Sequence, residues 1–308
     1  MSVTSHQAPG PAQRSRRSRR SRRSALWGPV FAGPHALGLL IFTITPIALA
    51  LVMSFNDWPM IGTPEPVGLD NFTYLLSDRV FLTALGNTLL FVALYLPLNL
   101  LISLGMAAWL SPKIKGRQIF RVIFFLPTVT PIVANAVVWR MLYQQDGVFD
   151  STAQTLFGIT LPDFLADPNW AMVAIVVMSV WQGFGYNMIV FSSALDSVPE
   201  SQTEAAALDG ANAWTVFWRI KLPLITPSLF FASTMTLITS LQVFIQPYIM
   251  TRGGPGDSTL TLVQFIYNQG FTFQNLGLAS AAAFILFVII LGITAVQFLG
   301  QKKWVHYE

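Results

Sequence analysis

The side chains of this chain that could contact a solute are neutral hydrogen-bonding groups set inside long apolar runs. Amides, hydroxyls and phenols donate and accept hydrogen bonds without carrying a full charge, so they suit a solute that bears hydroxyl groups. Most of them recur at helical spacing in two runs, which places each set on one helix face. The candidates for contact with a solute are Gln182, Tyr186, Asn187 and Ser193 in the first run, and Thr236, Thr239, Gln242 and Gln246 in the second.

A packing role is the alternative for the same residues, because polar side chains also bond helices to each other inside a membrane. Both interpretations stay open at this point. Other chemistry has little support. Cysteine is absent and the three histidines, His6, His35 and His306, are scattered, so no metal site is predicted. No G-x-x-x-x-G-K-[ST] phosphate loop occurs, so the chain is not expected to hydrolyse ATP.

The elements that must position these groups are membrane-spanning helices. The chain is 53% hydrophobic and only 10% charged, against roughly 25% charged in soluble domains. Its charge-free runs are near or above the ~18 residues that cross a bilayer as a helix, and they lack the alternation of β-barrel strands. The sequence predicts an all-α integral membrane protein with six transmembrane helices, at 30–53, 83–110, 119–142, 170–194, 223–249 and 276–300.

Lysine and arginine are distributed unequally between the two sides of this six-span prediction. Only Arg79, Arg140 and Arg252 fall on one side, and the other fifteen fall on the opposite side, which the positive-inside rule makes cytoplasmic. Both termini are therefore expected in the cytoplasm. The arginine run within 14–23 directly precedes the first span, so we expect it to contact anionic lipid rather than nucleic acid.

The domain organisation follows from these spans. Residues 1–24 are predicted to be a disordered basic cytoplasmic tail, residues 25–302 a single six-span domain, and residues 303–308 a second cytoplasmic tail. A loop at 196–222 joins the fourth and fifth spans and carries most of the acidic residues on the cytoplasmic side.

This loop is predicted to fold as two short helices joined by a glycine turn. Ser197 and Glu200 fit a capping box for the first helix, which runs to about Asp209. Gly210 can take the left-handed conformation that ends it. Asn212 can cap the second helix, which Pro223 is expected to close at Leu222.

The same loop carries a motif. Residues 204–223 fit the pattern E-A-A-x3-G-x9-I-x-L-P completely, and this pattern resembles the cytoplasmic loop of permease subunits of binding-protein-dependent ABC importers. The resemblance implies that the loop docks on an ATP-hydrolysing subunit. The residues that it assigns to coupling are Glu204, Ala205, Ala206, Asp209, Gly210, Ile220, Leu222 and Pro223.

Other segments resemble the carbohydrate-uptake permeases of this family, in particular the first of two paired permeases. They are Gly68-Leu69-Asp70-Asn71-Phe72, Asn87-Thr88, Phe125-Leu126-Pro127 with Trp139, and Thr251-Arg252-Gly253-Gly254-Pro255-Gly256 with Thr259, Tyr267 and Phe271. The resemblance covers about residues 25–300 and implies the type I ABC importer permease fold with cytoplasmic coupling helices.

The resemblance also implies the partners and the location. We expect a second homologous permease subunit, two cytoplasmic ATPase subunits that carry ATP and Mg, an extracytoplasmic solute-binding protein, membrane lipid and a sugar or related polyol phosphate as the substrate. This chain itself would hold no cofactor and catalyse no reaction. The expected location is the bacterial inner membrane.

Two other classes of function compete with an ATP-driven importer. An ion-coupled secondary transporter would use intramembrane acids or histidines, and the predicted spans contain no Asp or Glu. A membrane-embedded enzyme would need clustered carboxylates, histidines or Ser/Lys groups, which the sequence does not offer. Dependence of uptake on ATP rather than on an ion gradient separates the first two classes, and turnover without partners tests the third.

Overall fold

The computed structural model of the chain describes residues 33–110, 114–302 and 305. The predicted basic tail at 1–24 lies outside these residues, as does the predicted tail at 303–308 apart from Val305. The chain divides after Met53 into two compact units. The domain limits at residues 24 and 302 stay predictions.

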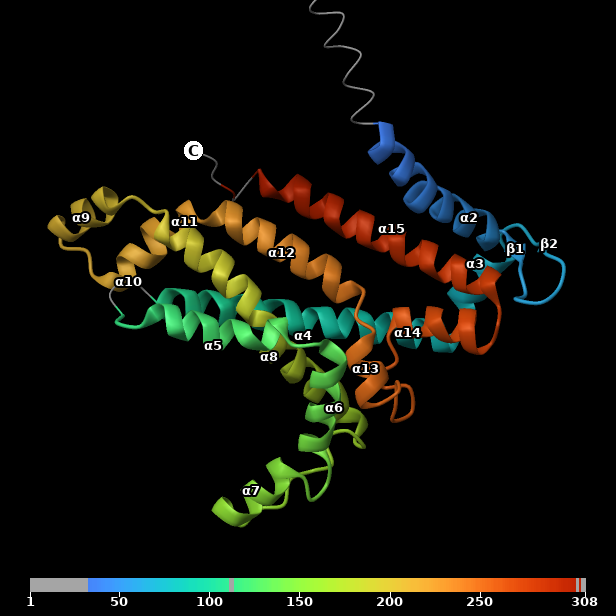
Figure 1. Ribbon diagram of the computed structural model, residues 1–308, viewed down its shortest axis with the longest axis horizontal. Helices are drawn as coiled ribbons and strands as arrows, with labels where there is room; N and C mark the ends of the chain where they lie inside the picture. The colour runs from blue at the N-terminus through green and yellow to red at the C-terminus, as the bar shows by residue number, and fades with distance from the viewer. Residues whose placement is uncertain (1–32, 111–113, 303–304, 306–308) are drawn as a thin grey trace, which may run out of the picture. The chain divides into compact units, whose positions relative to one another are not determined.

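The described part of the first unit, residues 33–53, belongs to one apolar helix, Gly33–Ser54. No residue in the most apolar window of this helix is buried. It contains a π-helical turn, η1 (Leu40–Ile44), followed by α2 (Thr45–Ser54) (Figure 1). Thr45 closes this turn, because both its amide and its hydroxyl donate to the Leu40 carbonyl, five residues earlier. The predicted first span is confirmed from residue 33 onward.

Three long helices of the second unit confirm predicted spans to within a few residues. They are α4 (Arg79–Trp109), α8 (Pro168–Asp196) and α15 (Leu276–Gln301), each long and apolar enough to cross a membrane. Side chains cap their first turns, where backbone amides have no helical partner. Asp78 accepts from the Phe81 amide at 3.0 Å and Asp167 from the Asn169 amide at 2.9 Å. These caps explain why the helices begin where they do.

The third and fifth predicted spans are not single straight helices. Each belongs to a pair of helices that is bent at a break, and counting each bent pair as one span gives up to six spans among the described residues. The third is broken between α5 (Arg117–Val129) and α6 (Ile132–Tyr143). The helical segments 117–129 and 132–157 are bent by 93° relative to each other at this break. Thr130 and Pro131 form the break, since a residue before proline avoids the helical conformation. The fifth predicted span, 223–249, is also interrupted. Its main helix, α12 (Thr226–Leu241), ends with Gln242 as its C-cap, and a separate helix, α13 (Ile245–Met250), follows.

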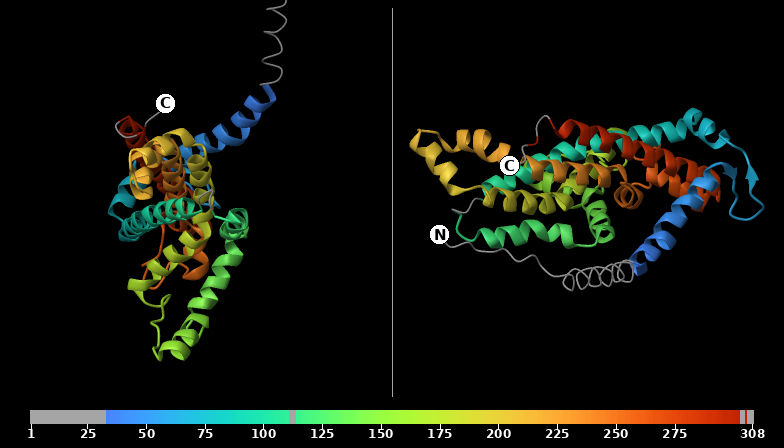
Figure 2. Two further views of the ribbon diagram at one scale, coloured as in Figure 1. Left: turned by 90° about the vertical axis from the view of Figure 1, so that its left-hand side faces the viewer. Right: turned by 90° about the horizontal axis from the view of Figure 1, so that it is seen from above.

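Shorter elements complete the unit (Figure 1). Strands β1 (Asn56–Asp57) and β2 (Glu65–Pro66) pair antiparallel, with Asn56 opposite Pro66. The short helices at the same end as the strands are α3 (Asp70–Ser77), α14 (Leu262–Tyr267) and the π-helical η3 (Asn268–Thr272), while α7 (Val148–Phe157) follows α6. At the opposite end lie α9 (Glu200–Leu208) and α10 (Ala213–Val216), continued by the π-helical η2 (Phe217–Lys221) and by α11 (Leu222–Leu224) (Figures 1 and 2).

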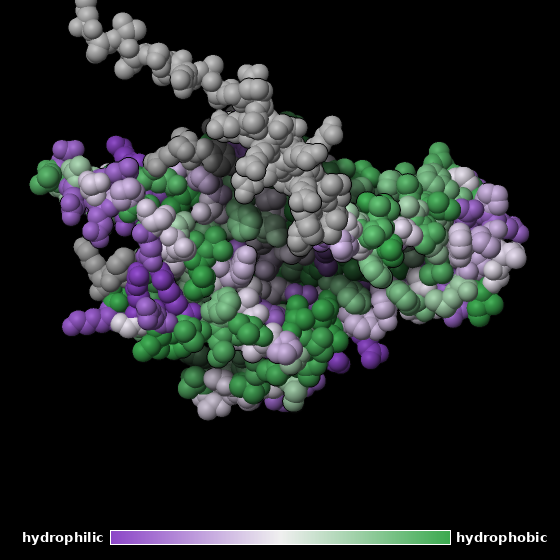
Figure 3. Space-filling model, turned by 45° about the horizontal axis from the view of Figure 1, so that its top comes forward, coloured by the Kyte–Doolittle hydropathy of each residue, from purple (hydrophilic) through white to green (hydrophobic). Residues whose placement is uncertain are grey.

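The core is formed mainly by α4 and α8, which pack side by side. Phe91, Ile175 and Met178 are almost completely buried in it. On the face drawn in Figure 3, hydrophobic residues spread along the helices and hydrophilic residues gather toward the two ends. This distribution suits helices that cross a bilayer with polar ends in water. The chain is therefore a multi-pass, all-α membrane protein.

Candidate functional site

The loop between α8 and α12 forms two short helices that meet at a glycine turn, as predicted. α9 ends at Leu208 with Asp209 as its C-cap. Gly210 has φ +81°, the left-handed conformation that strains any residue with a Cβ. The Ala211 amide donates to the Ala206 carbonyl at 2.9 Å and the Gly210 amide to the Ala207 carbonyl at 3.1 Å. This pair of bonds is a Schellman motif, which satisfies the carbonyls at the end of α9.

The second helix of the loop is capped as expected. The Asn212 side chain accepts a hydrogen bond from the Thr215 amide at 2.8 Å. Trp214 and Trp218 then pack edge to face, with ring centroids 5.4 Å apart. The angle between the two helices is therefore set by local bonds on both sides of Gly210.

No residue of α9 is buried in this chain. Glu204, Ala205 and Asp209 are exposed, and Ala206 is partly exposed. Leu208 is 90% exposed and Trp214 is 70% exposed. Large apolar side chains in such positions leave apolar area in water, which a protein partner can cover. At the base of the loop, Ile220, Leu222 and Pro223 are partly buried.

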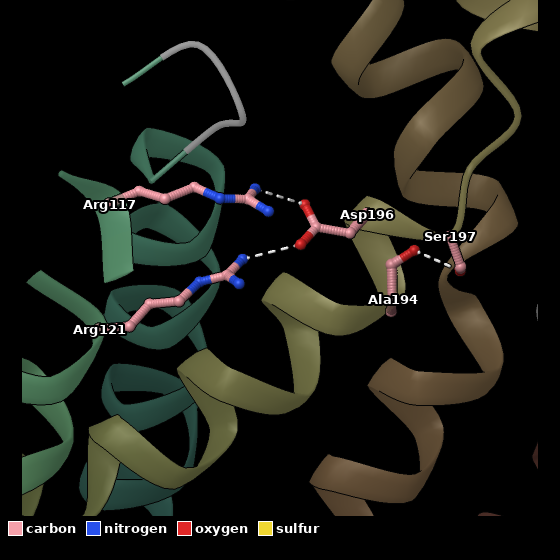
Figure 4. Close-up of polar contacts among 5 residues, drawn as sticks. All are labelled: Arg117, Arg121, Ala194, Asp196 and Ser197. Atoms are coloured by element: carbon pink, nitrogen blue, oxygen red, sulfur yellow. Dashed lines mark hydrogen bonds and ion pairs between the residues drawn. The ribbon is translucent and has the colours of Figure 1, made fainter. Parts of the chain in front are cut away.

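Two details of the loop differ from the prediction. The Ser197 hydroxyl does not cap α9. It donates to the Ala194 carbonyl at 2.7 Å (Figure 4), because Ser197 still continues the end of α8. Pro223 does not close the second helix, which runs on to Leu224 and bends by 68° into α12. Pro227 causes the bend. It has no amide proton to donate to the Pro223 carbonyl, which accepts instead from the Thr226 hydroxyl at 2.7 Å.

A pair of arginines on α5 holds the base of the loop. Arg117 Nη1 and Arg121 Nη2 each lie 3.0 Å from a different carboxylate oxygen of Asp196, the last residue of α8 (Figure 4). The arginines are four residues apart, so they share one face of α5. The side chains are 20–29% exposed, which shields the pairs in part from solvent screening. We call the two contacts among these three residues the Asp196 ion pairs.

A cavity of about 460 Å³ lies where α12 gives way to α13. Three of the predicted solute-contact residues line it: Thr239, Gln242 and Gln246. Aromatic rings of Phe91, Tyr95 and Phe244 form other parts of the wall, and none of its eleven described lining residues is charged. An apolar wall with a few converging polar groups is typical of small-molecule sites.

Two more of the predicted residues meet in a buried polar cluster beside this cavity. The Asn187 amide donates to Asn99 Oδ1 at 2.7 Å and to Thr236 Oγ1 at 2.9 Å, which joins α8 to α4 and α12. Asn99 in turn donates to the Tyr95 hydroxyl at 3.3 Å. Oδ1 of Asn187 is buried without a hydrogen-bond partner among the described residues. The cluster therefore bonds helices together and leaves one acceptor available.

The remaining predicted residues lie elsewhere. Gln182 is buried at the break between α5 and α6, where its Nε2 donates to the Thr130 carbonyl at 3.4 Å. Tyr186 is 47% exposed and Ser193 is exposed. The eight residues thus do not form one surface within this chain, and their part in a solute pathway stays a prediction. Among the described residues, no three His, Asp or Glu side chains group in a way that could hold a metal ion.

Sequence reasoning missed several residues of these sites. Leu208 follows the Glu-Ala-Ala triplet and could have been found as an apolar residue on a polar loop. Asn99 is an amide residue within a long apolar run, which is the same feature that identified Asn187. The Asp196 ion pairs join residues 75 and 79 positions apart, so no local pattern could have indicated them.

Comparison with known proteins agrees with this geometry. A family model described as "Binding-protein-dependent transport system inner membrane component" matches residues 99–304. The probable ABC transporter permease protein YesP of Bacillus subtilis (strain 168) is 34% identical, over 92% of this chain and 93% of its own length. The lactose transport system permease protein LacF of Rhizobium radiobacter is 34% identical, over 88% and 92%.

A solved structure has the same fold. In the crystal structure of a bacterial alginate ABC transporter in complex with an alginate pentasaccharide-bound periplasmic protein, one chain superposes with a TM-score of 0.77. The alignment covers 92% of this chain and 96% of that chain, at 24% sequence identity. The helices described above therefore form the type I ABC importer permease fold.

Proposed function

The chain belongs to the family of binding-protein-dependent transport system inner membrane components, and on that basis we propose that it is the sugar-translocating permease subunit of an ATP-driven importer. Its role is to form part of the path through the membrane. ATP would be hydrolysed by two separate cytoplasmic subunits, and a second homologous permease would complete the path. An extracytoplasmic binding protein would deliver the solute, and alternating access would move it inward.

The observation that carries this proposal is α9, a helix without a buried residue that is held at a defined angle. The Schellman motif at Gly210 and the Asn212 cap fix that angle by hydrogen bonds. Leu208, at 90% exposure, gains most from a partner that covers it. A preorganised helix of this kind binds without a large ordering cost. We assign it to the ATPase partner, with Glu204 and Asp209 as its polar contacts.

The orientation of the chain follows from charge. α9 would face the cytoplasm, because the Lys- and Arg-rich segments lie on its side of the six-span arrangement. Both termini would then be cytoplasmic, in the inner membrane of a bacterium. The end that carries β1, β2 and η3 would face the binding protein.

A carbohydrate substrate is supported by the cavity and by the relatives. LacF is a lactose permease by its description. In this chain, Thr239, Gln242 and Gln246 line one cavity together with aromatic residues. Amides can share hydrogen bonds in both directions with sugar hydroxyls. Gln182, Tyr186, Asn187, Ser193 and Thr236 complete the proposed pathway residues.

ATPase activity of the co-expressed complex in lipid tests the proposal. The measurement compares hydrolysis with and without the binding protein and a panel of sugars, in the wild type and in a Glu204→Lys plus Gly210→Pro variant. We expect sugar-loaded binding protein to stimulate hydrolysis in the wild type only. The responding sugar would identify the substrate.

Two outcomes contradict the proposal. If no ATPase associates with the wild-type chain and uptake follows a proton or sodium gradient, the chain is an ion-coupled secondary transporter. If the loop variant retains full stimulation, α9 is not the docking helix. A Phe157→Ala variant on α7 serves as the control, because Phe157 is also exposed, at 74%, but lies outside the loop.

A further inference from the structure

Four aromatic side chains form a continuous cluster beside the cavity. Phe244 and Tyr248 stack with their ring centroids 5.1 Å apart, and Tyr267 lies 5.2 Å from Phe244 and 5.5 Å from Tyr248. Phe271 extends the cluster at 5.2 Å from Tyr267. We call these four residues the aromatic track.

The track runs from the surface to the cavity. Phe271 is 66% exposed, and Tyr248 and Tyr267 are half-buried. Phe244 is half-buried and lines the cavity, together with Phe91 and Tyr95. The rings therefore lead from η3, at the end of the unit opposite α9 (Figure 1), to the amides of Gln242 and Gln246.

Hydrogen bonds hold the segments that carry the track. The Thr261 hydroxyl donates to the Val243 carbonyl at 2.9 Å, which ties the start of α14 to the residue before Phe244. The Leu262 amide donates to Thr88 Oγ1 on α4 at 2.8 Å. Asn87 donates to the carbonyls of Asp257 and Leu260 at 2.7 and 3.0 Å. Bonds between segments far apart in the sequence thus fix the rings on a rigid support.

The chemistry of the track suits the ring of an uncharged sugar. One face of a pyranose carries C–H groups, which pack on aromatic rings by dispersion. Tyrosine adds a hydroxyl for hydrogen bonding at the edge of such a contact. The neighbouring Tyr248 side chain raises the pKa of Tyr267 above its usual value. A phenol both donates and accepts hydrogen bonds without a full charge.

The lining of the cavity disfavours an anionic solute. A phosphate or carboxylate moved from water into a site without a cationic partner loses hydration that nothing replaces. The cavity offers amides, hydroxyls and aromatic rings, and no Lys or Arg among its described lining residues. Arg140 reaches α13, where it donates to the Ile249 carbonyl at 3.5 Å, but it does not line the cavity.

We propose that Phe244, Tyr248, Tyr267 and Phe271 form a subsite that stacks on uncharged pyranose rings at the mouth of the cavity. A neutral sugar would pass from Phe271 to Phe244 and then exchange ring contacts for hydrogen bonds with Gln242 and Gln246. The role of this subsite in import rests on the proposed function. Its affinity for a neutral sugar is a property of the chain and can be measured without transport.

Saturation-transfer NMR on the assembled complex in lipid nanodiscs tests the subsite. The probes are methyl α-D-glucopyranoside and methyl α-D-glucuronide, which differ by a carboxylate. We expect transfer to the ring C–H protons of the neutral probe, and a signal about three- to tenfold weaker in a Phe271→Ala plus Tyr267→Ala variant, the equivalent of losing one or two aromatic contacts. The glucuronide signal should be weak in both proteins.

The chain offers a matched control. Phe273 lies two positions from Phe271 and is 67% exposed, yet it is outside the aromatic track. Phe273→Ala should leave the signal of the neutral probe unchanged, and Tyr267→Phe, which keeps the ring, should retain most of it. An equal loss in Phe273→Ala, an unchanged signal in the double variant, or a glucuronide signal as strong as that of the glucoside overturns the proposal.

The measurement also separates this inference from the proposed function. If the neutral probe fails to bind while loaded binding protein still stimulates ATP hydrolysis, only the subsite is wrong. If no ATPase associates and the probe still binds to the chain alone in nanodiscs, the subsite stands and the importer assignment fails. Should Phe271→Ala weaken docking of the binding protein while the probe signal is unaltered, Phe271 is a protein contact and the subsite is again overturned.

Discussion

Arg121 and Asp196 lie 75 residues apart in the sequence, and their side chains meet at 3.0 Å across the interface of α5 and α8. Arg117 bonds to the other oxygen of the same carboxylate. Further along α5, the Thr128 hydroxyl donates to the Gln182 carbonyl at 2.9 Å. α5 is therefore bonded to α8 at the base of the loop and again at the break before α6. A partner that displaced α9 would act on both helices together.

Loss of the Asp196 ion pairs should uncouple hydrolysis from uptake. Partly exposed ion pairs contribute about 0.2–1 kcal/mol each, so Asp196→Asn should fold. We expect the ratio of sugar uptake to ATP hydrolysis in proteoliposomes to fall about threefold or more, because α5 would no longer move together with the loop at residues 196–222.

Charge exchange and neutralisation provide the controls for this variant. Combining Asp196→Arg with Arg117→Asp and Arg121→Asp should restore much of the ratio, since opposite charges again face each other. Lys115→Gln removes an exposed cation of the same region and should have no effect. An unchanged ratio in Asp196→Asn would show that the ion pairs serve folding alone.

Replacement of Gly210 should weaken ATPase association beyond its effect on stability. An alanine at φ +81° costs about 1–2 kcal/mol, and relief of that strain would rotate α9 against α10. Gly158→Ala is the matched comparison, because Gly158 ends α7 at φ +67° and also has no atom within 4 Å of an added Cβ. Both variants should lower the Tm similarly, and only Gly210→Ala should reduce co-purification of the ATPase.

Leu208→Ala should reduce ATPase binding without changing the stability of the chain. A side chain that is 90% exposed contributes little to folding, whereas covering it in an interface is worth about 1.5–3 kcal/mol. The dissociation constant for the ATPase should rise about tenfold or more. Equal binding of Leu208→Ala and wild type, measured by titration of the complex in nanodiscs, would place Leu208 outside the interface.

Two glycines in the spans should respond in opposite directions to alanine. A Cβ at Gly183 on α8 would clash with the Tyr95 hydroxyl of α4, whereas a Cβ at Gly105 on α4 would meet nothing within 4 Å. Gly183→Ala should therefore destabilise by about 1–3 kcal/mol, and Gly105→Ala should stabilise by up to about 1 kcal/mol through helix propensity. Thermal unfolding in detergent measures both.

The clash itself can be tested by a second substitution. Tyr95→Phe removes the hydroxyl that the new Cβ would meet, so it should restore part of the stability lost in Gly183→Ala. No rescue would mean that the Asn99 amide at 3.2 Å or the Tyr95 ring, rather than this hydroxyl, obstructs the new Cβ.

Features that depend on neighbours in the chain could be predicted from the sequence. Charge-free apolar runs identify α4, α8 and α15, because a helix satisfies its backbone groups within its own segment. The Asn212 cap and the Gly210 turn were also predictable, since each involves residues only a few positions apart. The capping box at Ser197 failed although its pattern was local, because α8 extended into it.

Features that depend on contact between distant segments were decided by the tertiary structure. Only the packed helices show a 93° break at Thr130 and Pro131 and a chain that leaves its helix at Gln242. The Asp196 ion pairs, the bonds from Asn87 and Thr88 to the loop before α14, and the aromatic track all join residues from separate helices. Their energies depend on distance and angle in space, which no spacing along the chain specifies.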